Sequence, residues 1–343
     1  MTYLDYYELA QEPFSNAPVS RFYFNSPQHA QALVRLTHVC AQMKGLGILV
    51  GDIGAGKTTL ARRLLDSLPE SEYEAALLVI IHSGVTAQWL LKRIALQLGV
   101  EAPSEDKLAL LGQLYQRLVK IYEQGKKAVV LIDEAQMLAS RELMEEFRGL
   151  LNLEVPERKL LSLIFFGLPE IEQNLKLDPP LAQRVAVKYR LSHLNAESTE
   201  AYIKHRLRLA GASRMPFTAE AVQAVHRFSG GTPRVINTLC DNALFEGYVA
   251  RAPVIDEQMI SRISLEIGLD GQDTALAQQA AILPAHAPAE GGGPSGGQAA
   301  AANISNPGAP ARGPAPSAPP AEPKRPLDLS EIDRYLAGLA KPS

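Results

Sequence analysis

Near the start of the chain stands Gly51-Asp52-Ile53-Gly54-Ala55-Gly56-Lys57-Thr58-Thr59, which fits the pattern G-x-x-x-x-G-K-[ST]. This stretch follows the apolar run Gly47-Ile48-Leu49-Val50 and precedes a helical segment from Leu60 to Leu68. A strand that feeds a helix through a glycine-rich turn predicts a phosphate-binding loop, because glycine lets successive backbone N–H groups face an anion at the positive end of the helix dipole. We therefore expect residues 51–59 to bind the phosphates of a nucleotide.

Three side chains of this loop have distinct expected roles. The Lys57 ammonium is placed to bridge the β- and γ-phosphates, and the Thr58 hydroxyl is placed to bind Mg²⁺. Thr59 is expected to reach the α-phosphate through its backbone or its hydroxyl. A chance meeting of glycines and a lysine in a turn is the plainer alternative, but it explains neither the strand before the loop nor the helix after it.

A second apolar run ends in two carboxylates. It reads Ala128-Val129-Val130-Leu131-Ile132 and is followed at once by Asp133 and Glu134. In a parallel sheet these carboxylates would lie at the carboxyl edge, beside the phosphate loop, in the arrangement known as Walker B. There Asp133 would hold Mg²⁺ through water, and Glu134 would position and polarise an attacking water.

Alternating strand and helix patterns predict a P-loop NTPase fold, with a three-layer α/β core built on a parallel sheet. From Ala196 onward the pattern is helical only, which predicts an all-helical lid. In its third helix Thr232 is expected as the N-cap and Pro233 at the first position, so that Arg234 lies at the helix start. The predicted strands are 47–50, 76–81, 128–133, 160–167 and 188–191, and the predicted lid helices are 196–210, 218–228, 233–249 and 256–265.

The expected domains are the α/β core at 1–194 and the helical lid at 195–270. Proline, alanine and glycine dominate after the lid, so residues 271–326 are predicted to be a disordered linker that cannot bury enough apolar surface to fold. Helical spacing returns in a short amphipathic element at 327–343, where Ser330 and Asp333 suit a capping box. This element is either a docking peptide or a free end, and the sequence favours neither.

Composition narrows the class of protein. With 343 residues, of which 46% are hydrophobic, the chain can bury a large core, and its net charge of −3 includes no basic domain that would indicate nucleic acid. Cys40 and Cys240 lack metal-ligand spacing and are expected to be small buried side chains in a reducing compartment. No stretch approaches the ~18 apolar residues needed to cross a bilayer, so we expect a cytoplasmic protein without a membrane span.

Aromatic side chains precede the phosphate loop and are candidates to stack on a nucleotide base. They are Phe14, Phe22, Tyr23 and Phe24, with packing in the core as the alternative for most of them. His29 begins a segment with apolar residues at helical spacing, and we expect it to be a surface or packing residue, since a lone histidine there is seldom a ligand.

Shorter motifs resemble those of one known family. They are Pro13-Phe14-Ser15, Asp133-Glu134-Ala135-Gln136, Gly167-x-Pro169-Glu170, Leu181-Ala182-Gln183-Arg184, and Pro233-Arg234 with Ile236-Asn237. With the phosphate loop, they make residues 3–267 resemble the AAA+ ATPases of the ExeA type. The resemblance implies hydrolysis of ATP with Mg²⁺ in a homo-oligomer. It also implies that Arg234 is a sensor for the γ-phosphate and that Arg184 is the finger that reaches a neighbouring subunit's nucleotide.

The chain departs from the family pattern in two places. Leu168 stands where a polar sensor residue is usual, and its side chain cannot hydrogen-bond water or phosphate, so hydrolysis is slow or another residue takes that role. The proline-, alanine- and glycine-rich tail replaces the transmembrane helix and wall-binding domain of secretion members, so direct wall binding is not expected.

Three functional hypotheses follow. The first is an ATPase that drives assembly or remodelling of a bacterial secretion or pilus-type envelope machine, with a protein partner bound through residues 327–340 and recruitment to the inner membrane. The second is a DNA-associated ATPase resembling transposition activators, which the lack of a basic stretch disfavours. The third is a scaffold that binds ATP and barely hydrolyses it, which Leu168 favours.

Overall fold

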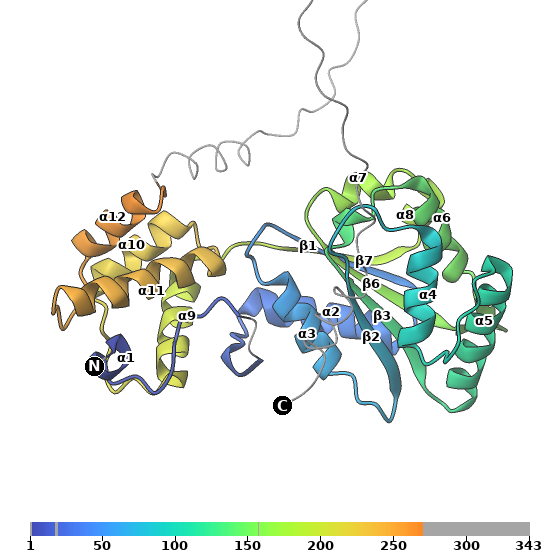
Figure 1. Ribbon diagram of the computed structural model, residues 1–343, viewed down its shortest axis with the longest axis horizontal. Helices are drawn as coiled ribbons and strands as arrows, with labels where there is room; N and C mark the ends of the chain where they lie inside the picture. The colour runs from blue at the N-terminus through green and yellow to red at the C-terminus, as the bar shows by residue number, and fades with distance from the viewer. Residues whose placement is uncertain (1, 18–19, 157, 270–343) are drawn as a thin grey trace, which may run out of the picture. The chain divides into compact units, whose positions relative to one another are not determined.

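The structure is a computed structural model that describes residues 2–17, 20–156 and 158–269 (Figure 1). The predicted linker at 271–326 and the predicted amphipathic element at 327–343 lie outside the described residues. Among the helices that are described, none is long and apolar enough to cross a bilayer.

A sheet of five parallel strands forms the centre of the α/β core, with the strand order β2-β3-β6-β1-β7 (Figure 1). All five predicted strands are present, although β2 begins and ends earlier than predicted and β7 begins earlier. The observed bounds are β1 Leu46–Gly51, β2 Tyr73–Val79, β3 Lys127–Asp133, β6 Leu161–Gly167 and β7 Val185–Leu191. Since all the strands are parallel, their carboxyl ends meet at one edge of the sheet.

The sheet is covered by helices on both faces, which confirms the predicted three layers. Alternate residues of each strand point to opposite faces: Ile48 and Phe165 pack in one cluster, whereas Leu49 and Phe166 pack in the other. One face is covered by α2 Pro27–Ala41 and α3 Lys57–Asp66, and the other by α4 Ala87–Gln97, α5 Lys107–Glu123 and α6 Arg141–Leu150 (Figure 1). The three central strands β1, β3 and β6 are therefore mostly apolar and buried, as expected for a covered parallel sheet, whereas the edge strand β7 alternates with exposed residues.

Helix α6 was not predicted from the sequence, although its signals are present. Ser140 caps it by accepting a hydrogen bond from the N–H of Leu143, and Leu143, Met144, Phe147 and Leu150 are buried along one face. The remaining core elements are too short for periodicity to reveal. They are η1 Ser20–Phe22, η2 Ala135–Met137, β4 Glu154–Val155, β5 Arg158–Lys159, α7 Ile171–Leu175 and α8 Pro179–Ala182.

The lid consists of α9 Ala196–Leu209, α10 Ala219–Ser229, α11 Pro233–Val249 and α12 Glu257–Glu266, close to the predicted bounds. Residues 192–195 join it to the core, and there the N–H of Leu194 donates to the carbonyl of Gly231, just before α11, at 2.9 Å. Gly231 has a φ of +75°, and a Cβ there would lie 1.9 Å from the Leu194 carbonyl oxygen, so no other residue fits. This contact fixes the start of α11 against the end of the core.

The first residues of the chain pack with the helices of the lid, although they precede the α/β core in the sequence. Helix α1, Tyr3–Tyr6, lies against α11, and the buried side chains of Tyr7 and Phe14 belong to the apolar cluster of the lid (Figure 1). Their apolar surface leaves water by inserting among lid helices that come late in the sequence, a long-range contact that local patterns do not report.

Both cysteines are buried side chains of the packing, as predicted. Cys40 lies on the buried face of α2 in the core, and Cys240 lies in the cluster of the lid. Burial raises the pKa of the Cys40 thiol to about 12, so this side chain stays a neutral thiol.

Candidate functional site: a phosphate loop beneath a helical lid

The phosphate loop joins β1 to α3 with two glycines in the left-handed region, Gly54 at φ +78° and Gly56 at φ +101°. Gly56 is the N-cap of α3 and has no side chain to cap the first N–H groups of that helix. These groups are therefore left for an anion, at the positive end of the helix dipole. The local sequence thus builds the loop as predicted, with its backbone donors at the carboxyl edge of the sheet.

Lys57 is the buried cation of this loop. Its side chain is only 6% exposed, and its Nζ donates to the carbonyl oxygen of Asp52 at 3.0 Å. Burial lowers the pKa of Lys57, while the nearby carboxylates of Glu134 and Asp133 act in the opposite direction by favouring the charged ammonium. The Lys57 ammonium therefore contacts the backbone of its own loop and lies near the carboxylates of Asp133 and Glu134 at the end of β3.

Asp133 is fully buried at the carboxyl end of β3. Its Oδ1 accepts the N–H of Glu134 at 3.0 Å, and the nearby Thr58 hydroxyl favours the charged form of the same carboxylate. Its Oδ2 is buried without a hydrogen-bond partner among the described residues. Burial raises the pKa of Asp133, because the charged form loses its water. Such an oxygen is costly unless something binds it, and carboxylate and hydroxyl oxygens are the ligands that Mg²⁺ prefers. Asp133 and Thr58 therefore fit a Mg²⁺ site.

Glu134 follows with a left-handed backbone, φ 55° and ψ 36°, and its Oε2 accepts a hydrogen bond from the Gln136 amide at 2.5 Å. The Oε1 of Gln136 accepts the backbone N–H of Leu168, the residue after β6, at 3.0 Å. Leu168 itself borders the pocket, where its side chain offers no hydrogen bond. The carboxyl ends of β3 and β6 are thus joined through one glutamine.

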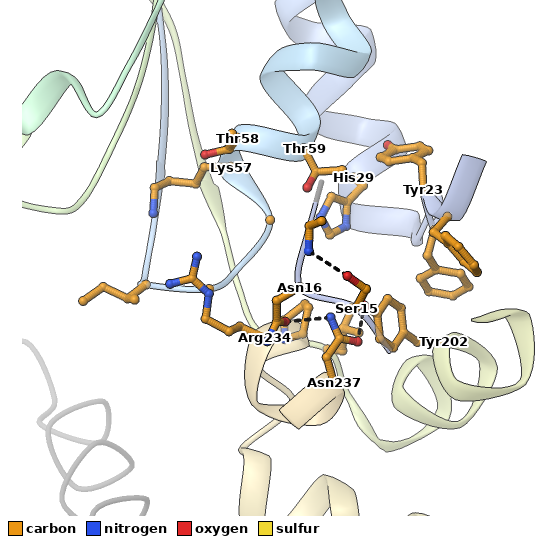
Figure 2. A pocket seen from close by; sticks show the side chains of 18 of the residues that line it. Ser15, Asn16, Tyr23, His29, Lys57, Thr58, Thr59, Tyr202, Arg234 and Asn237 are labelled. Atoms are coloured by element: carbon orange, nitrogen blue, oxygen red, sulfur yellow. Dashed lines mark hydrogen bonds between the residues drawn. The ribbon is translucent and has the colours of Figure 1, made fainter. Parts of the chain in front are cut away.

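A pocket of about 430 Å³ lies over this edge of the sheet, within the range of small-molecule sites (Figure 2). Figure 2 shows Lys57 and Thr58 at one end of it and Tyr23 and Tyr202 at the other. The core contributes His29, Ile53, Gly54, Gly56, Lys57, Thr58, Thr59, Glu134, Gln136, Met137 and Leu168. The N-terminal segment and the lid with its connection contribute Ser15, Asn16, Ala17, Phe22, Tyr23, Phe24, Leu194, Tyr202, Arg206, Pro233, Arg234 and Asn237. Of the predicted loop residues, Gly51, Asp52 and Ala55 are not among those lining it.

Three of the four predicted aromatic residues line the far end of the pocket. They are Phe22, Tyr23 and Phe24, whereas Phe14 packs inside the lid cluster. Tyr23 meets the edge of the His29 ring, with ring centroids 6.2 Å apart. The apolar faces at this end suit a planar base, and the donors of the loop suit phosphates, so the pocket matches a nucleotide in both chemistry and size.

His29, on α2, contacts the backbone of the phosphate loop. Its Nδ1 lies 2.7 Å from the Ser26 hydroxyl, and its ring also hydrogen-bonds the backbone of Ala55. Burial lowers its pKa to about 4, so the ring is neutral near pH 7. It is a packing residue, as expected, that also holds the phosphate loop in place.

Arg234 lies at the first turn of α11 and lines the pocket, with its backbone N–H donating to the carbonyl of Gly54 at 3.4 Å. Figure 2 shows its guanidinium turned toward the end of the pocket where Lys57 lies. Pro233 occupies the first position, as predicted, but the Thr232 hydroxyl makes no capping hydrogen bond. A Cβ on Gly54 would lie 2.8 Å from that of Arg234, so the loop needs glycine for this close approach of the lid.

Arg184 is not among the residues that line the pocket. It follows α8 and directly precedes β7, whose first residue, Val185, pairs with the first residue of β1, Leu46. The phosphate loop follows the other end of β1, so the six-residue strand, roughly 17 Å long, separates Arg184 from the loop along the sheet. The structure therefore does not bring Arg184 together with the other predicted site residues.

Several lining residues were missed by the sequence predictions. Arg206, on α9, donates to the carbonyls of Pro13 and Ser15, and its guanidinium lies 4.8 Å from the Phe22 ring centroid. Asn237, on α11, donates to Asn16 at 3.0 Å. Asn237 belongs to a motif of the family resemblance but had no predicted role, and Arg206 had no signal beyond a charged residue within a helical pattern. Only the fold shows that they tie the N-terminal segment to the lid over the pocket.

Comparison with known proteins agrees with this architecture. A family described as AAA domain matches residues 41–175. General secretion pathway protein A of Aeromonas hydrophila is 35% identical over 268 residues, which cover 77% of this chain and 48% of that protein. The chain thus corresponds to about half the length of this relative.

Solved structures share the fold at low identity. Cdc6p from Pyrobaculum aerophilum is 16% identical with a TM-score of 0.55, over 71% of this chain and 67% of that one. A Walker-type ATPase of Pyrococcus abyssi is 18% identical with a TM-score of 0.54, over 78% and 80%. The Aeropyrum pernix ORC2 protein, solved as ADPNP and ADP complexes, is 16% identical with a TM-score of 0.52, over 72% and 71%.

The phosphate loop, the paired carboxylates after β3 and the helical lid occur here in the order that the sequence motifs predicted, and the family match covers the first two. Residues 41–175 accordingly match the AAA domain family, and the chain is related to general secretion pathway protein A over about half the length of that protein.

Proposed function

We propose that this protein is a Mg²⁺-dependent ATPase that hydrolyses ATP to ADP and phosphate. The observation that carries the proposal is Asp133, whose buried Oδ2 has no hydrogen-bond partner among the described residues and whose carboxylate lies close to the Thr58 hydroxyl of the phosphate loop. Asp133 and Thr58 would hold a Mg²⁺ ion, which would satisfy the buried carboxylate and offset the charge of the phosphates.

The residues of the pocket have different roles in the hydrolysis that we propose. Lys57 offsets the β- and γ-phosphate charge, and Glu134, which lines the pocket beside it, orients and polarises the attacking water. Arg234 contributes a second positive charge from the lid. Because its guanidinium would contact the γ-phosphate, the position of the lid would change when that phosphate is lost. Mg²⁺, held by Thr58 and Asp133, would supply the Lewis acid that neutralises developing charge.

Metal removal tests this proposal directly. The purified full-length chain is expected to release phosphate from ATP in the presence of Mg²⁺, to stop when the metal is chelated, and to resume when Mg²⁺ is added back. Phosphate release that continues unchanged in excess chelator would contradict the assignment of Asp133 and Thr58, because a metal-independent site leaves the buried oxygen unexplained.

We further propose that the ATPase acts as a homo-oligomer, with Arg184 reaching the nucleotide of a neighbouring subunit. Its place at the amino end of β7, away from its own pocket, supports a role in trans. A guanidinium is a long, positively charged side chain that can stabilise the charge that spreads over the transferring phosphoryl group.

Replacing Arg184 with alanine is therefore expected to leave ATP binding by the isolated subunit nearly unchanged and to lower hydrolysis by the oligomer about 10³-fold or more, the scale of an arginine finger. Binding is measured by titration and turnover by phosphate release at increasing protein concentration. Arg227→Ala is the matched control, since Arg227 pairs with Glu257 on the exposed lid surface, where loss of an ion pair costs at most about 1 kcal/mol.

Mixing variants distinguishes a shared site from a surface ion pair. Arg184→Ala and Glu134→Gln subunits are each inactive on this hypothesis, but a mixed interface that joins an intact arginine to an intact glutamate should recover part of the activity. If both variants assemble and no ratio recovers activity, the site is not shared between subunits.

The cellular role we propose is assembly or remodelling of a bacterial secretion or pilus-type envelope machine. The relation to general secretion pathway protein A supports it. We place the protein in the cytoplasm, with recruitment to the inner membrane by a protein partner through residues 327–340. Secretin or pilus genes beside its coding gene would support this role, whereas a neighbouring transposase gene would contradict it in favour of a DNA-associated ATPase.

A further inference from the structure

Gln136 joins the ends of two neighbouring strands at the floor of the pocket. Its Nε2 donates to Glu134 after β3, and its Oε1 accepts the N–H of Leu168 after β6. The two strands are paired in parallel, with Ile132 opposite Phe165. The amide orientation is dictated by its neighbours, because a backbone N–H can only face the oxygen and the carboxylate can only face the nitrogen.

The Glu134 carboxylate depends on this contact for its position. Its backbone is left-handed, at φ 55°, so neither a strand nor a helix directs the side chain. Within the described residues, the Gln136 amide supplies the hydrogen bond that this carboxylate accepts. A glutamate that must orient one water needs a fixed carboxylate, because a displacement of about 1 Å can reduce a rate about 100-fold.

Gln136 is itself held tightly enough to act as a brace. Its backbone carbonyl accepts the Asn174 amide at 2.8 Å. A Cβ on Gly167 would lie 3.1 Å from Oε1 of Gln136 and 3.3 Å from its backbone nitrogen, so the glycine at the end of β6 leaves the room that the amide uses. The short helix η2, Ala135–Met137, thereby presents Gln136 in one orientation to both strands.

The apolar side chain of Leu168 gives the Gln136 amide a second role in the site. Its side chain borders the pocket without any polar atom, so the end of β6 has no side chain that can bond water or phosphate. Gln136 also lines the pocket and is bonded to that same residue through its backbone. The Nε2 of an amide carries two hydrogens, and the bond to Glu134 uses one of them. The polar group at this point of the site is therefore the amide of Gln136.

We propose that Gln136 is the positioning residue for Glu134: it holds the carboxylate in the orientation that directs the attacking water and supplies the polar group that Leu168 does not. This proposal rests on the ATPase function proposed above. Gln136 acts through Glu134, so its loss should affect turnover and leave nucleotide binding intact.

Two near-isosteric variants test the proposal. Gln136→Met removes both hydrogen bonds, and Gln136→Glu keeps the acceptor for the Leu168 N–H but replaces the donor to Glu134 with a repelling carboxylate. Each is expected to lower kcat about 10- to 100-fold, with an unchanged Kd for ATP and an unchanged melting temperature in the presence of ATP. Gln97→Met is the matched control, because Gln97 is exposed at the end of α4 and distant in sequence from every lining residue.

A double-mutant cycle separates positioning from a structural role. In a Glu134→Gln background, Gln136→Met should cause no further loss of turnover, because the two residues act as one unit. Losses that multiply, a weakened Kd for ATP, or wild-type turnover by both Gln136 variants while Glu134→Gln is blocked would each overturn the proposal and leave the ATPase standing. Absence of hydrolysis by the wild type would overturn the ATPase and this proposal together.

Discussion

Replacing Lys57 with alanine should abolish nucleotide binding. The ammonium is buried at 6% exposure and faces Asp133 and Glu134 across the loop. Without the ammonium, the carboxylates of Asp133 and Glu134 would repel the phosphates, and no cation of the loop would offset that repulsion. The charge-assisted hydrogen bonds between the ammonium and the phosphates would also be lost. Such bonds contribute about 1.5–3 kcal/mol each, so we expect Kd for ATP to rise by roughly 100-fold or more.

Titration calorimetry with ATP and Mg²⁺ measures this loss. Lys92→Ala is the control for a lost lysine, because Lys92 lies on α4, pairs with Glu105 at the surface and does not line the pocket. ATP binding to Lys57→Ala at the affinity of the wild type, with the fold shown to be intact, would mean that the phosphates bind elsewhere.

Replacing Glu134 with glutamine should preserve ATP binding and block hydrolysis. The amide has the size of the carboxylate but cannot polarise the attacking water, while Asp133 and Thr58 remain to hold Mg²⁺. Loss of one preorganised group of this kind lowers kcat by about 10²–10³, or about 3–4 kcal/mol of barrier.

Single-turnover phosphate release, with binding measured in parallel, tests this expectation. Glu142→Gln is the matched control, since Glu142 is exposed in the first turn of α6. If Glu134→Gln hydrolyses ATP at the rate of the wild type, Glu134 does not direct the water, and the role of Gln136 fails with it.

The local sequence predicted the phosphate loop and the carboxylates after β3, because both depend on residues adjacent in the chain. A glycine-rich turn between a strand and a helix creates its own anion site, and an apolar run that ends in Asp133-Glu134 brings its carboxylates to the edge of any parallel sheet. The helical lid was predictable for the same reason, since helical periodicity is a property of neighbours.

Contacts between distant residues were beyond such patterns. The aromatic end of the pocket forms where Arg206 of the lid donates hydrogen bonds to the carbonyls of Pro13 and Ser15. Tyr7 and Phe14 likewise bury their rings in the lid, far along the chain from their own position. Every residue has a backbone carbonyl, so the sequence does not indicate which carbonyls an arginine will bind. An aromatic residue can likewise pack in any apolar cluster with enough room, so the sequence does not indicate which cluster it joins.

The sequence by itself therefore determined the chemistry of the phosphate end, because loop, helix and strand end are each encoded within a few consecutive residues. Only the tertiary structure decided how Glu134 is held and where Arg184 lies. The first depends on pairing β3 with β6 so that Gln136 can reach both Glu134 and the Leu168 N–H, and the second depends on the register of β7 against β1. Strand order and register arise from the burial of whole faces, which no short stretch of residues specifies.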